Sequence, residues 1–163
     1  GGVATLVSPA IGGALEASVL VGARRGSWLS PSLAVGGVIA LPALARSGDA
    51  RATAALQAGR LDLCPARLAG GAFVLRPCAR VILGRSQVRS EGFTGARLDE
   101  RIFGVVGLAV RGEAAIGGPV FVQADVAVGA PLERATYVVG TTRVFETPGL
   151  SLGGSLGAGV HFW

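Results

Sequence analysis

The sequence predicts an all-β fold in which eight antiparallel, up-and-down strands close into a barrel, and three observations favour it. Apolar residues recur at every second position along most of the 163-residue chain, which is the period of a strand. Glycine contributes 27 residues while only 6% of the chain is aromatic, a poor composition for a soluble core built on bulky rings. The connections between the alternating segments are short and long in turn.

The composition also excludes several classes of protein. Half of the residues are hydrophobic and the net charge is only +5, which excludes a disordered chain. The glycines follow no three-residue period, which excludes collagen. All 15 basic residues are arginines, scattered without interleaved aromatics, so we expect no nucleic-acid binding. Arginine without lysine, together with abundant alanine and glycine, is typical of a GC-rich bacterial genome.

The start of the chain carries no methionine and none of the charged and apolar stretches of a signal peptide. We therefore expect a mature or excised domain, residues 1–163, whose targeting segment is absent.

The first strands are less regular than the later ones. Gly1–Val7 is short and has no decisive face, whereas Leu15–Arg24 alternates apolar residues with Glu16, serine and glycine. Gly26–Ala45 is an uncharged run of the length of a membrane helix. Its two prolines and its alternation from Trp28 onward favour a strand instead.

The fourth expected strand, Arg51–Cys64, contains one break in the alternation. Leu56 falls on the polar face and Gln57 on the apolar face. A bulge near Gly59 would restore the pattern, and a misread register is the alternative. The last four strands alternate cleanly and are expected at Gly71–Ser86, Ile102–Arg111, Val120–Glu133 and Leu150–Trp163.

The lengths and faces of these strands predict that they cross a membrane. Most span ten to fourteen residues, where a tilted membrane strand needs about 9–11 and a soluble strand about 5–6. The polar face consists mainly of glycine, serine and alanine, which solvate an outer surface poorly. We expect this face to line a narrow lumen and the apolar face to meet lipid, in a transmembrane β-barrel whose closure leaves no unpaired edge.

The connections fit a sided barrel, because outer-membrane barrels have short periplasmic turns, longer external loops and periplasmic termini. The expected short connections are Ala23–Ser27, Pro65–Gly70 and Glu113–Gly118. The expected long connections are Ala43–Ala50, Gln87–Asp99 and Arg134–Gly149, with Ser8–Gly12 a brief exception on their side.

On strand number, alternation, loop asymmetry and an aromatic C-terminus, the whole chain resembles the eight-stranded outer-membrane barrels of the OmpA/OmpX type. The resemblance implies the outer membrane of a Gram-negative bacterium, with the lipid bilayer and lipopolysaccharide around the protein and the barrel-assembly machinery as a partner. It also implies an assembly signal at Phe162 and Trp163, although the apolar face ends at Phe162 and Trp163 lies on the other face.

Two cysteines fall on the polar face, Cys64 at the end of one strand and Cys78 near the start of the next. A hairpin turning near Gly70 and Gly71 would bring them almost opposite each other. In an oxidising bacterial envelope we expect a disulfide, and two unpaired thiols are the alternative. A zinc site is not expected, because the chain has one histidine and no CxxC spacing.

The longest polar side chains also fall on the lumen face. Eight strands leave an interior just wide enough for side chains to fill, and the glycine-rich last strand makes room for arginines from the opposite wall. We therefore expect a salt-bridged plug, and an ion path is the alternative. The expected network consists of Glu16, Arg60, Asp62, Arg76, Arg80, Arg111, Glu113 and Asp125.

No catalytic or cofactor site is expected. Gly153–Gly157 matches the G-x-S-x-G pattern, but that elbow needs a strand–turn–helix and an acid between serine and histidine, and no acidic residue follows Ser155. The chain is expected to be no enzyme and to have a structural, adhesive or accessory role through its external loops. A narrow channel for ions or small solutes and a soluble, lipocalin-like ligand-binding barrel are the alternatives.

Overall fold

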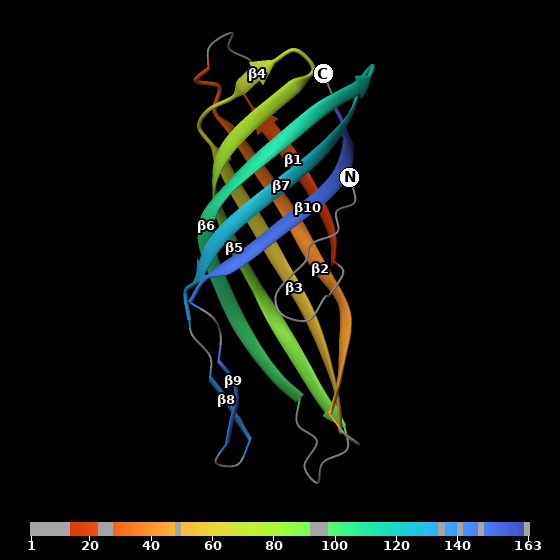
Figure 1. Cartoon of the computed structure of the whole chain (residues 1–163), viewed down its shortest axis with the longest axis vertical. Helices are drawn as coiled ribbons and strands as arrows, with labels where there is room; N and C mark the ends of the chain where they lie inside the picture. Colours follow the sequence, from red (N-terminus) through yellow and green to blue (C-terminus); the bar gives the residue numbers. More distant parts are fainter. Residues whose placement is uncertain are drawn as a thin grey trace.

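A computed structural model describes residues 14–22, 28–47, 50–91, 98–133, 136–139, 142–146 and 149–161. These residues form antiparallel strands that are steeply tilted around a curved sheet (Figure 1). No helix in this part of the chain is long and apolar enough to cross a membrane. The strands are β1 (Ala14–Gly22), β2 (Ser32–Ser47), β3 (Ala50–Cys64), β4 (Leu68–Gly70), β5 (Phe73–Glu91), β6 (Leu98–Gly117), β7 (Val120–Pro131), β8 (Thr136–Val139), β9 (Thr142–Glu146) and β10 (Ser151–Val160).

The main sheet has eight strands in the order β1-β2-β3-β5-β6-β7-β10, with β4 paired to β5 beside this path. The predicted all-β antiparallel architecture is therefore confirmed. Within the described residues the sheet is an open half-barrel, because β1 and β10 are its edges and do not pair with each other. The first expected strand, Gly1–Val7, and the expected assembly signal, Phe162 and Trp163, lie outside the described residues.

The short connections differ from the prediction. Pro65–Gly70 contains β4, which pairs with the start of β5, so that the hairpin turns at Gly71. Likewise β6 continues to Gly117, and its turn to β7 is at Gly118. Both turn glycines have positive φ, 59° and 55°, a conformation that glycine adopts without steric cost. Ala23–Ser27 lies outside the described residues.

The long connections were predicted too long, because the strands extend into them. β2 and β3 have 16 and 15 residues, and β5 and β6 have 19 and 20. Residues 43–47 and 50, and residues 87–91, 98 and 99, are therefore in strands, and the described part of Arg134–Gly149 contains the separate β8–β9 hairpin. The sequence stops alternating between apolar and polar residues in these extensions, yet backbone pairing continues.

The predicted bulge near Gly59 is wrong. Residues 56–63 of β3 keep one register with both neighbours, and the irregularity lies instead in β2, between Ala40 and Ala43. Gln57 faces outward and accepts a hydrogen bond of 3.2 Å from Nη2 of Arg85 on β5. The alternation breaks here because the outer face of the sheet becomes polar.

The distribution of side chains is the reverse of that in a soluble protein. On the outer face Leu108, Val126 and Leu156 are 66%, 67% and 71% exposed, whereas Val81, on the same face, is half-buried. On the inner face charged side chains are buried. In the described residues, the buried hydrophobic set is limited to Ala14, Ala34, Cys64, Cys78 and Ala109.

Candidate functional site

The inner face carries all eight charged residues of the expected network, and every one is buried. They lie on alternate positions of β1, β3, β5, β6 and β7, because side chains of a strand point to opposite faces in turn. Four arginines face four carboxylates, so their formal charges cancel. Their exposed fractions are Glu16 4%, Arg60 4%, Asp62 0%, Arg76 8%, Arg80 8%, Arg111 1%, Glu113 7% and Asp125 4%.

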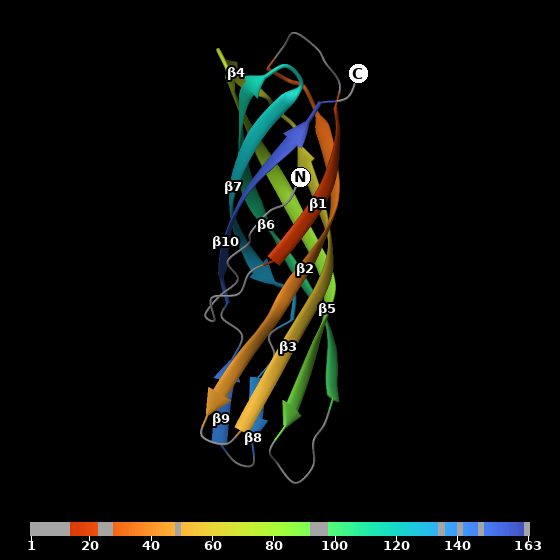
Figure 2. The ribbon, with the colours of Figure 1, turned by 90° about the vertical axis from the view of Figure 1, so that its right-hand side faces the viewer.

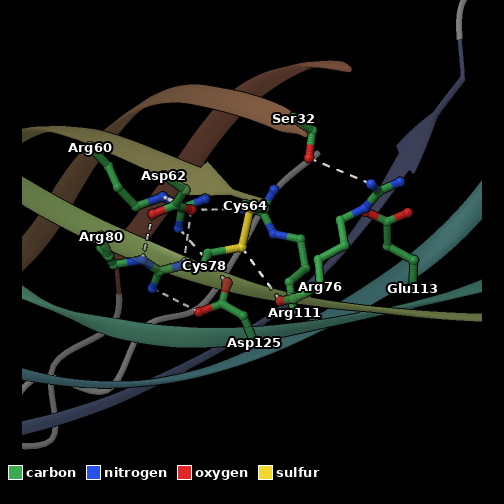
Figure 3. Close-up of a disulfide and its surroundings, with 10 residues drawn as sticks. All are labelled: Ser32, Arg60, Asp62, Cys64, Arg76, Cys78, Arg80, Arg111, Glu113 and Asp125. Atoms are coloured by element: carbon green, nitrogen blue, oxygen red, sulfur yellow. Dashed lines mark hydrogen bonds and ion pairs between the residues drawn. A yellow bond between two sulfur atoms is a disulfide. The ribbon is translucent and has the colours of Figure 1, made fainter. Parts of the chain in front are cut away.

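Asp62 on β3 is the centre of the network (Figure 3). Its carboxylate accepts two hydrogen bonds from Arg80, of 2.7 Å from Nε and 3.1 Å from Nη2. It also accepts one of 2.7 Å from Nη2 of Arg111 and forms an ion pair of 3.2 Å with Nε of Arg60. Because Asp62 and Arg80 are register partners on adjacent strands, the fork-to-fork geometry needs no backbone adjustment.

Asp125 on β7 extends the network toward the last strand. Its Oδ1 accepts a hydrogen bond of 2.9 Å from Nη1 of Arg80, and its Oδ2 accepts one of 2.5 Å from Oγ of Ser155 on β10. Nη1 of Arg60 lies 3.8 Å from the same Oδ2 and forms an ion pair with Glu16 on β1. Side chains thus connect β1 to β10, the two edges of the sheet.

A second, smaller group lies nearer the short turns. Nε of Arg76 donates to Oε1 of Glu113 at 3.2 Å, and its Nη1 lies 3.5 Å from Oγ of Ser32. This group joins β2, β5 and β6. Together, the two groups link seven strands of the sheet through side chains as well as through backbone pairing. These strands are β1, β2, β3, β5, β6, β7 and β10.

The expected disulfide is present between Cys64 and Cys78, whose Cα atoms are 4.0 Å apart. It lies on the inner face among the charged residues (Figure 3) and packs against Ala109. Leu63 and Ala79 are register partners, so each cysteine extends that pairing by one position. The bond therefore links β3 to β5 immediately beside the Asp62–Arg80 pair.

The glycines of β10 do not all have the role that was predicted for them. A Cβ atom on Gly153 would meet nothing within 4 Å, whereas one on Gly159 would clash with the ring of Phe121. Phe121 in turn lies against His161, with ring centroids 4.5 Å apart. Gly159 thus makes room for an aromatic ring rather than for an arginine. In the sequence, the contact between Gly159 and Phe121 was indicated by Phe121 itself, which is the single aromatic residue on the polar face of β7.

The chemistry of this inner face is that of ion pairing. Ser155 donates its hydroxyl to Asp125, and His161 lies against Phe121. The described residues contain no group of three or more His, Cys, Asp or Glu that could hold a metal ion.

Comparisons with protein-family models, with curated proteins and with solved structures found no match to this chain.

Proposed function

We propose that this chain is an integral outer-membrane β-barrel whose lumen is plugged by side chains and whose part outside the membrane has a structural or adhesive role. One observation carries the proposal: large apolar side chains are exposed on the outer face while charged side chains are buried on the inner face. In water this arrangement would expose the hydrophobic surface and desolvate the charges. In a lipid bilayer the hydrophobic outer surface is no longer exposed to water.

The height of the apolar face supports a membrane. Along β5 the outer face is apolar from Phe73 to Leu83, ten residue steps, which correspond to about 25 Å at a tilt of about 40°. The apolar band of an outer-membrane barrel is about 25 Å tall. It ends at Arg85, which pairs with Glu100 at 3.4 Å and with Gln57.

Closure of the barrel is part of the proposal. An open sheet edge in hydrocarbon would leave backbone groups without partners, at several kcal/mol each. The network already connects Glu16 on one edge strand to Ser155 on the other through Arg60 and Asp125.

The strands that continue beyond the apolar band support an adhesive role. β7 pairs with β6 only from Val105 onward, so among the described residues Leu98–Phe103 of β6 pair with β5 alone. Such an edge offers backbone donors and acceptors to an extended segment of another protein. We propose that this edge, outside the membrane, is the adhesive surface.

The experiment is refolding into lipid vesicles followed by electrophoresis with and without boiling. A closed barrel migrates differently before and after boiling, and protease added outside the vesicles cleaves only the extensions and loops. Identical migration of both samples and complete digestion would contradict the proposal. Steady conductance across a planar bilayer would favour the channel alternative, since the plug predicts little or none.

A further inference from the structure

We infer that the Cys64–Cys78 bond forms by exchange with the disulfide of a thiol oxidoreductase, and that this reaction precedes the packing of β2, β6 and β7 around the two cysteines. The inference goes beyond the proposed function, because it concerns the reaction that supplies the folded chain. It starts from burial: Cys64 is 0% exposed and Cys78 is 4% exposed.

Strands other than the two that the disulfide joins cover the sulfur atoms. Ser32 on β2 is the register partner of Cys64, and Ala109 on β6 is the register partner of Cys78. Ala109 packs against both cysteines, and Ala127 on β7 packs against this cluster. The bond therefore becomes inaccessible only when β2, β6 and β7 are in place.

Charged side chains close the approach along the inner face in both directions (Figure 3). On one side lie Asp62 and Arg80, joined by hydrogen bonds of 2.7 and 3.1 Å. On the other side lie Arg76 and Glu113, joined at 3.2 Å. All four side chains are buried. A sulfur atom of another molecule could therefore reach the cysteines of the folded chain only after these ion pairs had separated.

The chemistry requires that contact. Thiol–disulfide exchange proceeds by attack of a thiolate on a disulfide sulfur, through a mixed disulfide. Here the thiolate of one cysteine attacks the disulfide of the oxidoreductase, forms the mixed disulfide and releases one enzyme thiol. The thiolate of the other cysteine then attacks the sulfur of the first, forms the Cys64–Cys78 bond and releases the second enzyme thiol. This chain loses two electrons and two protons, and the oxidoreductase gains them.

A local hairpin brings the cysteines together without the rest of the sheet. The connection from β3 to β5 turns at Gly71, with β4 paired to β5 beside it. The pairing of β3 with β5 includes Leu63 and Ala79, the neighbours of the two cysteines. A hairpin forms in about 1–10 μs, whereas disulfide formation takes seconds to hours. We therefore place oxidation after formation of this hairpin and before the flanking strands bury it.

The experiment compares one exchange reaction on the folded and the unfolded chain. The whole chain is reduced, refolded in detergent with its thiols free, and exposed to oxidised glutathione as the probe disulfide, and mass spectrometry counts the bonds. We expect complete oxidation of the unfolded chain and none of the refolded chain in the same time. Failure of the reduced chain to refold, where the oxidised chain does, also supports the order, because the bond is then required for folding. Oxidation of the refolded chain as fast as the unfolded chain would overturn it.

Two single-thiol variants on β3 separate burial from the reactivity of the thiol itself. Cys78→Ser leaves one thiol, that of Cys64 on the inner face. Gln57→Cys, in a chain that also carries Cys64→Ser and Cys78→Ser, places one thiol at an exposed position on the outer face. In the folded proteins we expect a mixed disulfide with glutathione at position 57 and none at Cys64. Both thiols should react at similar rates after unfolding, and equal rates in the folded proteins would contradict the inference.

The reverse reaction gives a second measurement, on the oxidised chain as it folds natively. Reduced glutathione should leave the Cys64–Cys78 bond of the folded chain intact for the period in which it reduces that of the unfolded chain. Equal rates would overturn the inference and leave the membrane barrel unaffected, since the outer face takes no part in the exchange. A chain that fails the electrophoretic test of the barrel, with its bond still protected, would contradict the proposed function alone.

Discussion

Arg80 on β5 donates a hydrogen bond of 2.9 Å to Asp125 on β7, although β6 lies between these two strands. The contact is possible because the sheet curves and because Gly107, the β6 residue opposite Arg80, has no side chain. Arg80 therefore bridges Asp62 and Asp125, and this relationship makes the inner face one network rather than a series of neighbouring pairs.

Removal of the Arg80 guanidinium should destabilise the protein strongly. Arg80→Ala leaves the carboxylates of Asp62 and Asp125 without their best-oriented partner in a buried site, and breaking a buried pair in this way costs about 3–5 kcal/mol. Urea unfolding in detergent, followed by tryptophan fluorescence, measures the change. Arg85→Ala is the matched control on the same strand, because its exposed pair with Glu100 is worth about 0–1 kcal/mol. Equal effects of both substitutions would show that the network adds nothing.

Loss of two arginines should also affect the permeability of the proposed barrel. We expect little or no steady conductance from the unmodified protein across a planar bilayer, because the ion pairs fill the lumen. The double variant Arg76→Ala/Arg80→Ala removes one arginine from each group of the network and should be less stable and show a leak. A stable ohmic conductance of the unmodified protein would contradict the plug and favour the channel alternative.

Reduction of the Cys64–Cys78 bond should lower the unfolding midpoint. The two cysteines are 14 positions apart, and closing a loop of about 15 residues contributes about 3 kcal/mol in the chain-entropy model. Unfolding with and without reductant measures the effect. The Cys64→Ser/Cys78→Ser variant should be insensitive to reductant. Detection of two free thiols in the unfolded, unreduced protein would show that the disulfide is absent.

An arginine on the outer face should lower the free energy of unfolding more, the deeper it lies in the bilayer. Val126 lies in the middle of β7 and is 67% exposed, so Val126→Arg should destabilise by about 2–4 kcal/mol. Val160→Arg, at the end of β10, should cost about 0–1 kcal/mol. Unfolding in lipid vesicles compares the two variants, and a larger effect at Val160 would contradict the proposed position of the bilayer.

The face of the sheet on which each side chain lies could be predicted from the sequence, because side chains of a strand point to the two faces in turn. Asp125 is buried and Val126 is exposed, as alternation requires. The register of the cysteines could be anticipated for the same reason, since a short hairpin leaves few alternatives.

Other features depend on the polar ends of the strands or on contacts across the sheet. The predicted strand Gly71–Ser86 ends just after Arg85, whereas β5 continues to Glu91, because a polar outward residue such as Arg85 ends the apolar alternation without ending the strand. The choice of Asp62 as the partner of three arginines depends on the curvature of the sheet, which alternation does not encode. The same is true of Phe121, whose ring occupies the space that Gly159 leaves on the facing strand.

The most direct test of the central claim, an apolar face in lipid around a charged interior, is the accessibility of nitroxide labels in vesicles. Labels are placed on single cysteines at two adjacent pairs, Asp125 with Val126 and Ser155 with Leu156, while the native cysteines stay bonded to each other. We predict that the labels at Val126 and Leu156 collide with oxygen dissolved in the bilayer, and that those at Asp125 and Ser155 do not. Water-accessible labels at Val126 and Leu156, with lipid-accessible labels at their neighbours, would contradict the account.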